Sequence, residues 1–590
     1  MNYNEISSFI WGTADLLRNT YKQHEYGGII LPFTVMRRLD IVLKPTKAAV
    51  LKANESTLPT AIKETQLMKA AGSVGFYNTS RYTMESLLDE ADDIKDNLIS
   101  YVTSFSADMA DVFEKFKIFD VIKTLADNDL LYLVVERFCE PEVDLSPESV
   151  DNAAMGDIYE ELIRKFSEVS NETAGEHFSP RDGLALAAEL LIAGAKEDLT
   201  KPNGIVKVCD PCAGTGGALN VFEEKVRALN NELDQDVTVV TYAQEINDES
   251  YAICKSDTVL KGGNAVNVHK GDTLADDLMA GETFGYQISN PPYGVKWEKS
   301  KKAVVKEHEE KGFAGRFGAG LPRINDGQLL FVQHMVAKMR PKSEGGGRIA
   351  VFLNGSPMFT GAAGSGESEI RKYLLENDLV EAIIAMPNDF FFNTGISTYI
   401  WVLSNNKIPQ RQGKVQLINA NDIYMKMPRS LGSKRVKFSN SQIQDIMNLY
   451  SQFDSADESV SKVFANEDFG YIQVDVMRPL VDSATGKVVV DKKGRPKADK
   501  SLKDTECIPL RENPEDYLDR EVRPFAPGAW IESRKDKATK QMVLGTVGYE
   551  IQFSRYFFKF EEMRPSSEIL ADLHRIELEI SSLFDEIGGK

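Results

Sequence analysis

The chain has 590 residues and a formal net charge of −20, with 42% hydrophobic, 9% aromatic and 27% charged residues. These values are ordinary for a globular protein and exclude a mainly disordered, collagen-like or disulfide-scaffold chain. An acidic excess of this size also argues against a protein that coats nucleic acid with its whole surface. Three stretches are nevertheless locally basic: 296–311, 426–437 and 487–503.

No apolar run reaches the 18 or so residues that a bilayer span needs, and the start of the chain lacks the basic and apolar segments of a signal peptide. The five cysteines form an odd, sparse set, which is typical of reduced thiols. Cys209 and Cys212 have no second cysteine pair or nearby histidines to complete a zinc site. We therefore expect a cytoplasmic protein with no membrane partner and no metal.

Residues 1–150 are predicted to form a helical N-terminal domain, because apolar residues recur at helical spacing from Phe9 to Leu43. This part contains no catalytic constellation. A packing or interaction role is the simplest interpretation.

Residues 151–470 alternate between strand and helix signals. Strands are expected at 205–208, 237–242, 286–289, 348–353, 379–385 and 398–404. Such alternation predicts a parallel, doubly wound α/β sheet with binding loops at the carboxyl ends of its strands.

Residues 471–590 are predicted to be a polar, turn-rich extension that ends in a helix. Apolar residues in this helix follow steps of 4, 3, 4, 3 and 4: Ile569, Leu573, Ile576, Ile580, Leu583 and Ile587. This heptad pattern fits a helix packed on its own domain, or a coiled-coil arm that docks on another subunit.

The first chemical motif is a glycine loop between the strand at 205–208 and the next helix. Its candidate ligand-binding residues are Asp210, Gly214, Thr215, Gly216 and Gly217. Glycines allow a tight turn and a close approach of a ligand to the backbone. A carboxylate there would repel a pyrophosphate but attract a cationic amino-acid group, so the loop favours S-adenosylmethionine over NAD.

Two further acidic positions follow later strands. Glu245 closes the segment Tyr242-Ala243-Gln244-Glu245 at the edge of the second predicted strand, where a carboxylate can accept both hydroxyls of a ribose. Asp272, beside Thr273, could accept the amino group of an adenine ring.

The most specific motif is Asn290-Pro291-Pro292-Tyr293, directly after the strand at 286–289. The two prolines fix an extended turn. The Asn290 side-chain oxygen and the Pro291 carbonyl can then accept both N–H bonds of one planar amino group, while the Tyr293 ring stacks on its base. Such acceptors would make a weakly nucleophilic aromatic amine more reactive toward a sulfonium methyl group.

Together these motifs resemble the amino-methyltransferases of DNA, with the cofactor motif first in the chain. Several segments narrow the resemblance to the modification subunit of type I restriction-modification systems, and it covers nearly the whole chain. These segments are 9–18, 174–181, 386–387 and 390–396.

The resemblance implies a Rossmann-like S-adenosylmethionine-dependent methyltransferase core with a helical N-terminal domain and a C-terminal coiled-coil-type helix. It also implies a role for each motif residue. His177, Phe178, Ser179 and Pro180 would close over the cofactor; Asp210 and the glycine loop would hold its methionine end, Glu245 its ribose, and Asp272 with Thr273 its adenine. Asn290 and Pro291 would grip the N6 amino group of a flipped adenine, with Pro292 shaping the turn and Tyr293 and Phe391 or Phe392 sandwiching the base.

The resemblance further implies partners. A separate specificity subunit would choose the DNA sequence, in a complex with two modification chains, and a restriction subunit would join the full assembly. The terminal heptad helix is a natural dock, and 296–323 is expected to be a loop, either on the DNA side or merely solvated.

Two alternatives stay open. The same tetrad occurs in methyltransferases that act on protein glutamine or on RNA, although the large helical domain and the heptad tail argue against those smaller enzymes. A catalytically silent assembly subunit is the other alternative, and the intact Asp210, Glu245 and Asn290 argue against it.

Overall fold

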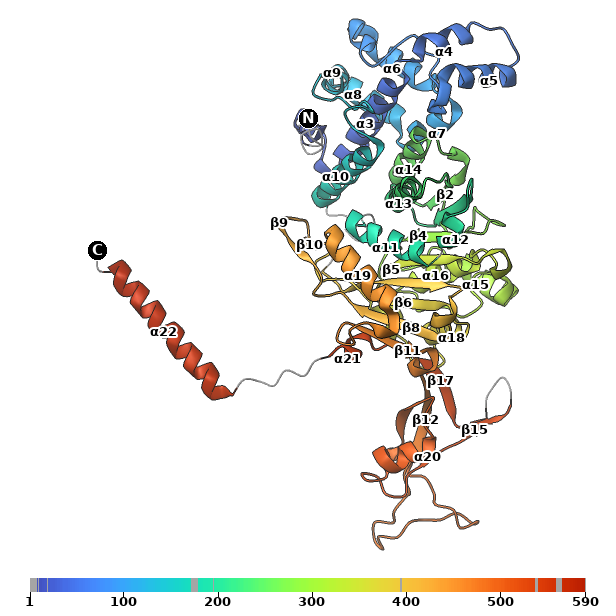
Figure 1. Ribbon diagram of the computed structural model, residues 1–590, viewed down its shortest axis with the longest axis vertical. Helices are drawn as coiled ribbons and strands as arrows, with labels where there is room; N and C mark the ends of the chain where they lie inside the picture. Colours follow the sequence, from blue (N-terminus) through green and yellow to red (C-terminus); the bar gives the residue numbers. More distant parts are fainter. Residues whose placement is uncertain are drawn as a thin grey trace. The chain divides into compact units, whose positions relative to one another are not determined.

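The computed structural model describes residues 8, 10–18, 20–170, 179–194, 196–392, 395–535, 540–558 and 565–588 (Figure 1). The chain divides into two compact units, Met1–Ile551 and Gln552–Lys590. Within the described ranges, no helix combines the length and the apolar character that crossing a membrane requires.

The first 150 residues are helical, as predicted. Their helices, with the one that follows, are α2 (Ala14–Leu17), α3 (Tyr26–Leu43), α4 (Lys47–Asn54), α5 (Thr60–Ala71), α6 (Ile94–Thr103), α7 (Ala107–Lys115), α8 (Ile118–Asp127), α9 (Leu131–Cys139) and α10 (Asn152–Ser170). The central helix α3 is buried along nearly its whole length. The buried Arg38 guanidinium on this helix donates to the Val150 carbonyl at 2.9 Å, which ties α3 to the start of the next region.

The hydrophobic core of this helical part does not stop at residue 150. It includes Ala252, Ile253 and Val259 of α14 (Asp248–Leu260), a helix of the α/β region. The Asp111 carboxylate on α7 accepts hydrogen bonds from Tyr251 and Lys255 of α14, each at 2.7 Å. The helical part and the α/β part therefore share one core.

The α/β region is built on a nine-stranded sheet. Its strands are β1 (Ile205–Asp210), β2 (Thr238–Glu245), β3 (Val268–Lys270), β4 (Tyr286–Ser289), β5 (Arg348–Asn354), β6 (Val380–Ala385), β7 (Thr398–Ser404), β8 (Lys414–Asn419) and β11 (Ser461–Ala465). They lie in the order β11-β8-β6-β7-β5-β4-β1-β2-β3. The main helices of this region are α11 (Arg181–Ala193), α13 (Gly217–Leu233), α14, α16 (Gln328–Ala337), α18 (Gly366–Glu376) and α19 (Asn440–Gln452).

The predicted α/β class is confirmed, but the prediction of a wholly parallel sheet was wrong. Strand β7 runs antiparallel to both β5 and β6, and β11 runs antiparallel to β8. The connection from β6 to β7 has no helix in its described part. Parallel neighbours need a long crossover, usually helical, so this short connection reverses the chain instead.

The strand order reverses between β1 and β4. Val208 of β1 pairs with Thr241 of β2 on one side and with Tyr286 of β4 on the other, all three strands being parallel. In open α/β sheets, ligands bind in the crevice outside the carboxyl ends of the strands at such a reversal. The topology therefore places a binding site beyond Asp210 and Ser289.

Three smaller β elements are described in the first unit, one of them the pair of β15 (Arg534–Lys535) and β16 (Met542–Val543). A hairpin is formed by β9 (Met425–Leu431) and β10 (Lys434–Lys437), and a four-stranded sheet by β12 (Gly470–Met477), β13 (Asp504–Pro509), β14 (Trp530–Ile531) and β17 (Gly545–Tyr549). The buried Arg371 guanidinium on α18 donates to the carbonyls of Tyr549 at 2.5 Å and Pro357 at 3.1 Å. Residues 471–549 thus belong to the first unit, whereas their polar, turn-rich sequence predicts one extension with the terminal helix.

The second unit contains α21 (Phe553–Tyr556) and α22 (Ser566–Gly588), and α22 confirms the predicted terminal helix. Four heptad positions in α22 have exposed fractions of about one half: Ile569 46%, Leu573 54%, Ile576 47% and Ile580 48%. An apolar stripe of this kind is typical of a helix that packs against another surface.

Candidate functional site

The predicted site residues meet where the sheet order reverses. Asp210 is the last residue of β1, Glu245 is the last residue of β2, and Asn290 directly follows β4. Because these strands are parallel neighbours, their carboxyl ends lie at the same edge of the sheet.

Asp210 is a buried carboxyl group with a 2% exposed fraction. Its Oδ1 accepts hydrogen bonds from the Ser289 hydroxyl at 2.6 Å and from the Cys212 backbone N–H at 3.0 Å. Burial raises the pKa of Asp210 to about 7, and these two hydrogen bonds offset only part of that effect. Within the described ranges no cationic side chain pairs with Asp210, so this carboxyl group suits a ligand that brings a positive charge.

The glycine loop turns directly into a helix. Gly216 has a positive φ of 88°, and a Cβ atom there would lie 3.0 Å from the Cys254 sulfur. Only glycine meets both conditions without strain. Helix α13 begins at Gly217, and a small hollow at this point is lined by Ser179, Asp210, Gly214, Thr215, Gly217 and Asn290, among others.

Glu245 is fixed by the backbone around it. Its two carboxylate oxygens accept N–H groups from Gly214 at 2.8 Å and from Asn247 at 2.7 Å. A carboxylate has about four lone-pair positions, so two remain to receive the hydroxyls of a ribose.

Asp272 and Thr273 lie on the adjacent wall. The Asp272 carboxylate accepts the Ser300 hydroxyl at 2.6 Å and the Leu274 N–H at 3.0 Å, and the Thr273 hydroxyl donates to the Pro211 carbonyl. A cavity of about 500 Å³ is lined by several predicted site residues, namely Glu245, Asp272, Thr273, Asn290 and Pro292. This cavity and the hollow at the glycine loop share Cys212 and Asn290 as lining residues.

The segment expected to be a loop at 296–323 instead contains α15 (Lys301–Lys311) and packs beside this cavity. Arg316 of this segment is largely buried. Its guanidinium donates to the carbonyls of Thr273 at 2.5 Å and Leu274 at 3.2 Å, and it pairs with Glu307 at 2.7 Å. Neither Arg316 nor Ser300 was foreseen from the sequence, because a contact between residue 272 and residue 300 leaves no local pattern.

The Asn290 tetrad forms the remaining wall. The Tyr293 hydroxyl donates to Asn290 Oδ1, and the Tyr293 ring meets Phe391 edge-on with centroids 6.3 Å apart. Phe391 is only 4% exposed and packs against Phe352, whereas Phe392 is partly exposed. The Tyr293 hydroxyl thus occupies one of the two lone-pair positions of Asn290 Oδ1.

The segment predicted to close over the cofactor is described only in part. Ser179 lines the hollow at the glycine loop, and Pro180 is buried just before α11. His177 and Phe178 lie outside the described residues.

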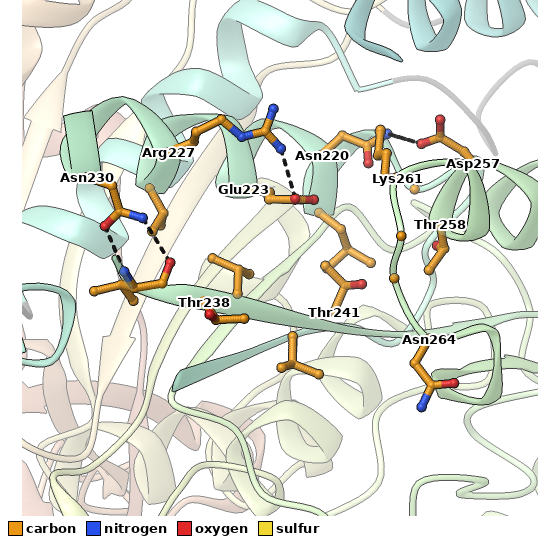
Figure 2. Close-up of a pocket in the computed structure, with 18 of the residues that line it drawn as sticks. Asn220, Glu223, Arg227, Asn230, Thr238, Thr241, Asp257, Thr258, Lys261 and Asn264 are labelled. Carbon is orange, nitrogen blue, oxygen red and sulfur yellow. Dashed lines mark hydrogen bonds and ion pairs between the residues drawn. The ribbon is translucent and has the colours of Figure 1, made fainter. Parts of the chain in front are cut away.

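A separate cavity of about 510 Å³ lies between α13, β2 and α14 (Figure 2). Several of its polar side chains pair with one another. Asn220 and Lys261 both bind the Asp257 carboxylate, at 2.8 Å and 2.5 Å, and Arg227 pairs with Glu223 at 3.1 Å. Of the predicted site residues only Gly216 lines this cavity, so the strand edge is the better candidate site.

Family models match two parts of the chain. The model described as N-6 DNA Methylase matches residues 150–470, and the model described as HsdM N-terminal domain matches residues 6–138. Among curated proteins, the type I restriction enzyme MjaIX methylase subunit of Methanocaldococcus jannaschii is 24% identical over 77% of this chain and 78% of its own length. The HindI methylase subunit of Haemophilus influenzae is 26% identical over 46% of this chain and 55% of its own length.

Solved structures share the fold. A type I restriction-modification methyltransferase subunit from Streptococcus thermophilus superposes with a TM-score of 0.62 at 21% identity, over 80% of this chain and 97% of its own. A modification subunit of a type I restriction enzyme from Vibrio vulnificus gives 0.53 at 15% identity, over 83% and 95%.

Proposed function

Because this chain belongs to the N-6 DNA methylase family, we propose that it transfers a methyl group from S-adenosylmethionine to the N6 amino group of adenine in DNA, as the modification subunit of a type I restriction-modification system. The observation that carries the proposal is that Asp210 and Asn290 meet at one edge of the sheet and line the same hollow. One of them suits a cationic cofactor, and the other suits a neutral amino group.

The residues at this edge fit S-adenosylmethionine. The Asp210 carboxyl group lacks a cationic partner in the described chain and would receive the amino group of the cofactor. Glu245 would bind the ribose hydroxyls and Asp272 the adenine amino group, both from the 500 Å³ cavity. When bound, the cofactor supplies an electrophilic methyl group on its sulfonium.

The chain's own part in the reaction is to hold the target amine. Asn290 Oδ1 and the Pro291 carbonyl would each accept one N–H bond of the adenine amino group. This holds the nitrogen lone pair away from the ring and directs it at the methyl carbon. Stacking of Tyr293 against the base, with Phe392 as the more exposed of the two candidate phenylalanines, would fix its plane.

Ser300 offers a first test of the role proposed for Asp272 in binding the adenine of the cofactor. Ser300→Ala removes the 2.6 Å hydrogen bond to the Asp272 carboxylate without touching the glycine loop. We expect the Kd for S-adenosylmethionine to rise about 3- to 10-fold, because Ser300 acts only by orienting Asp272 and a typical intramolecular hydrogen bond contributes ~1 kcal/mol. Calorimetric titration measures this change. Ser300→Thr, which keeps the hydroxyl, is expected to restore most of the affinity, and equal affinity for alanine and threonine would remove the proposed role.

We further propose that sequence choice rests with a separate specificity subunit, bound by two copies of this chain, and that a restriction subunit joins the full complex. The exposed heptad stripe of α22 supports this arrangement, because an amphipathic helix buries such a stripe against a partner.

The proposed docking through the apolar stripe of α22 can be tested by introducing charged residues into it. Leu573→Glu with Ile580→Glu places two carboxylates on the apolar face of α22, where both native side chains are about half exposed. We expect assembly with the specificity subunit to weaken at least 100-fold, as two buried apolar anchors would be lost, while cofactor binding stays unchanged. Analytical ultracentrifugation measures the assembly. Glu577→Gln, at an exposed position of α22 outside the apolar stripe, is the control. Unaltered assembly of the double variant would disprove docking through α22.

The proposed function itself is tested by transfer of labelled methyl from S-adenosylmethionine to unmethylated DNA, with the chain alone and with its specificity subunit. Label should appear as N6-methyladenine after digestion to nucleosides. Cofactor binding without label in DNA would favour a protein or RNA substrate instead. Absence of cofactor binding would favour a silent assembly subunit.

A further inference from the structure

The β9–β10 hairpin carries an unusual charge for this acidic chain. Residues 425–437 contain five cations, Lys426, Arg429, Lys434, Arg435 and Lys437, and no acidic residue. The whole chain, in contrast, has a net charge of −20. Lys434 is buried and pairs with Asp182 at 3.2 Å. The other four cations are exposed, and none forms an ion pair with a described residue.

The strand geometry sorts these cations onto two faces. Along β10 burial alternates, with Lys434 and Val436 inside and Arg435 and Lys437 outside. Successive side chains of a strand point to opposite faces, so Arg435 and Lys437 both point away from the core. On β9, Lys426 and Arg429 are exposed as well. Lys426 pairs with Val436 in the hairpin register, so it lies on the opposite face from Arg435 and Lys437.

The hairpin is bonded directly to the aromatic segment of the candidate site. The backbone N–H groups of Ser433 and Arg435 donate to the carbonyls of Phe392 at 2.7 Å and Asp389 at 2.9 Å. The Lys434 ammonium donates to the Phe390 carbonyl at 3.0 Å and lies 3.8 Å from the centre of the Phe390 ring. The next residue, Phe391, is the one that contacts Tyr293.

We propose that the exposed cations of this hairpin bind the phosphates beside the flipped adenine, so that Lys426, Arg429, Arg435 and Lys437 hold the DNA strand while the base lies in the site. This inference rests on the proposed function and extends it to the DNA backbone. A flipped nucleotide costs several kcal/mol in lost stacking and pairing, and phosphate contacts near the flipped position offset that cost. Such contacts carry no sequence information, which suits a chain whose sequence choice comes from another subunit.

The buried Lys434 has a different part in this arrangement. Its ammonium is held by Asp182 and by the Phe390 carbonyl, so it is not available to a phosphate. It fixes the hairpin against the aromatic segment, and the outer cations are thereby held at a set distance from Tyr293.

The test uses the full chain assembled with its specificity subunit and a mixed-sequence DNA duplex as the probe. The variant Lys426→Gln/Arg429→Gln/Arg435→Gln/Lys437→Gln removes the four exposed charges, and Lys52→Gln/Lys69→Gln removes two exposed lysines of α4 and α5 as a control. We expect DNA binding by the quadruple variant to weaken about 10- to 100-fold, and the slope of log Kd against log salt to fall by about 3 to 4, because each phosphate contact contributes roughly 0.9. The KM for DNA should rise to the same extent, with kcat at saturating DNA, cofactor Kd and Tm unchanged.

Each other result contradicts the inference in a distinct way. An unchanged salt slope with weaker assembly would mean that the hairpin faces an acidic protein surface. A fall in cofactor affinity or Tm that matches the loss of methyl transfer would make the hairpin a structural brace. If the parent complex itself puts no methyl into DNA, the proposed function fails, and the hairpin inference fails with it.

Discussion

Replacing Asn290 by alanine is expected to lower methyl transfer by about a thousandfold, which corresponds to ~4 kcal/mol of transition-state stabilisation. Asn290 Oδ1 is the side-chain acceptor at the tetrad, and Asn290 lines both the hollow at the glycine loop and the 500 Å³ cavity. Without it, only the Pro291 carbonyl would hold the amine, which would then stay planar and weakly nucleophilic. Single-turnover assays with saturating cofactor and DNA measure the loss directly.

Two controls separate chemistry from folding. Cofactor binding to the Asn290→Ala variant should change less than threefold, because Asp210, Glu245 and Asp272 supply the contacts proposed for it. Asn231→Ala, at an exposed position of α13, should leave both rate and affinity as in the parent. Parent-like single-turnover rates in Asn290→Ala would remove the proposed role.

Replacing Asp210 by asparagine is expected to have two opposite effects, since the carboxyl group is buried and its pKa is raised to about 7. The first is a loss of S-adenosylmethionine affinity of about a hundredfold, or ~3 kcal/mol, because a charge-assisted hydrogen bond to the cofactor amino group is lost. The second is a gain in stability without cofactor. Above pH 7 the native protein must hold a buried, ionised carboxylate, which costs about 4 kcal/mol relative to an unfolded chain with an ordinary aspartate.

The sign of the pH dependence follows from the raised pKa. The native state binds more protons than the unfolded state between about pH 4 and pH 7, so the parent loses stability as pH rises through that window. Cofactor affinity should change in the other direction and improve up to about pH 7, because the ionised carboxylate is the form that attracts an amino group. Urea unfolding of parent and variant at pH 5 and pH 8, with cofactor titrations at the same pH values, tests both. Equal stability of the two proteins at pH 8 would contradict the buried charge, and threefold or smaller loss of affinity would contradict the amino-group contact.

The fold could be predicted where the local pattern is strong. The strands at 286–289 and 398–404 coincide with β4 and β7, because each is a short, fully buried run with clear ends. The short strand β3 and the strands β8 and β11 were not predicted, and neither was the antiparallel direction of β7. Strand direction depends on how a connection crosses the sheet, which no run of side chains records.

The residues of the candidate site also fall into those that the sequence predicts and those that only the folded structure brings together. Asp210, Glu245 and Asn290 could be assigned because each lies at or directly after the end of a strand and carries a side chain of fitting chemistry. Ser289 adjoins the tetrad and could have been noticed, yet its hydrogen bond to Asp210 exists only because β1 and β4 are neighbours. The contacts of Ser300 with Asp272 and of Arg316 with Thr273 could not be predicted, because they depend on how the segment around α15 folds back on the site.

The core shared by α3 and α14 limits how this molecule can be taken apart. Residue 150 marks a change of secondary structure, but the side chains of Ala252, Ile253 and Val259 complete the packing of helices that lie before it. A fragment that ends near residue 150 would expose that apolar face, and a fragment that begins there would leave Tyr251 and Lys255 without Asp111. Chimeras with relatives should therefore exchange the helical part together with α14, or leave both in place.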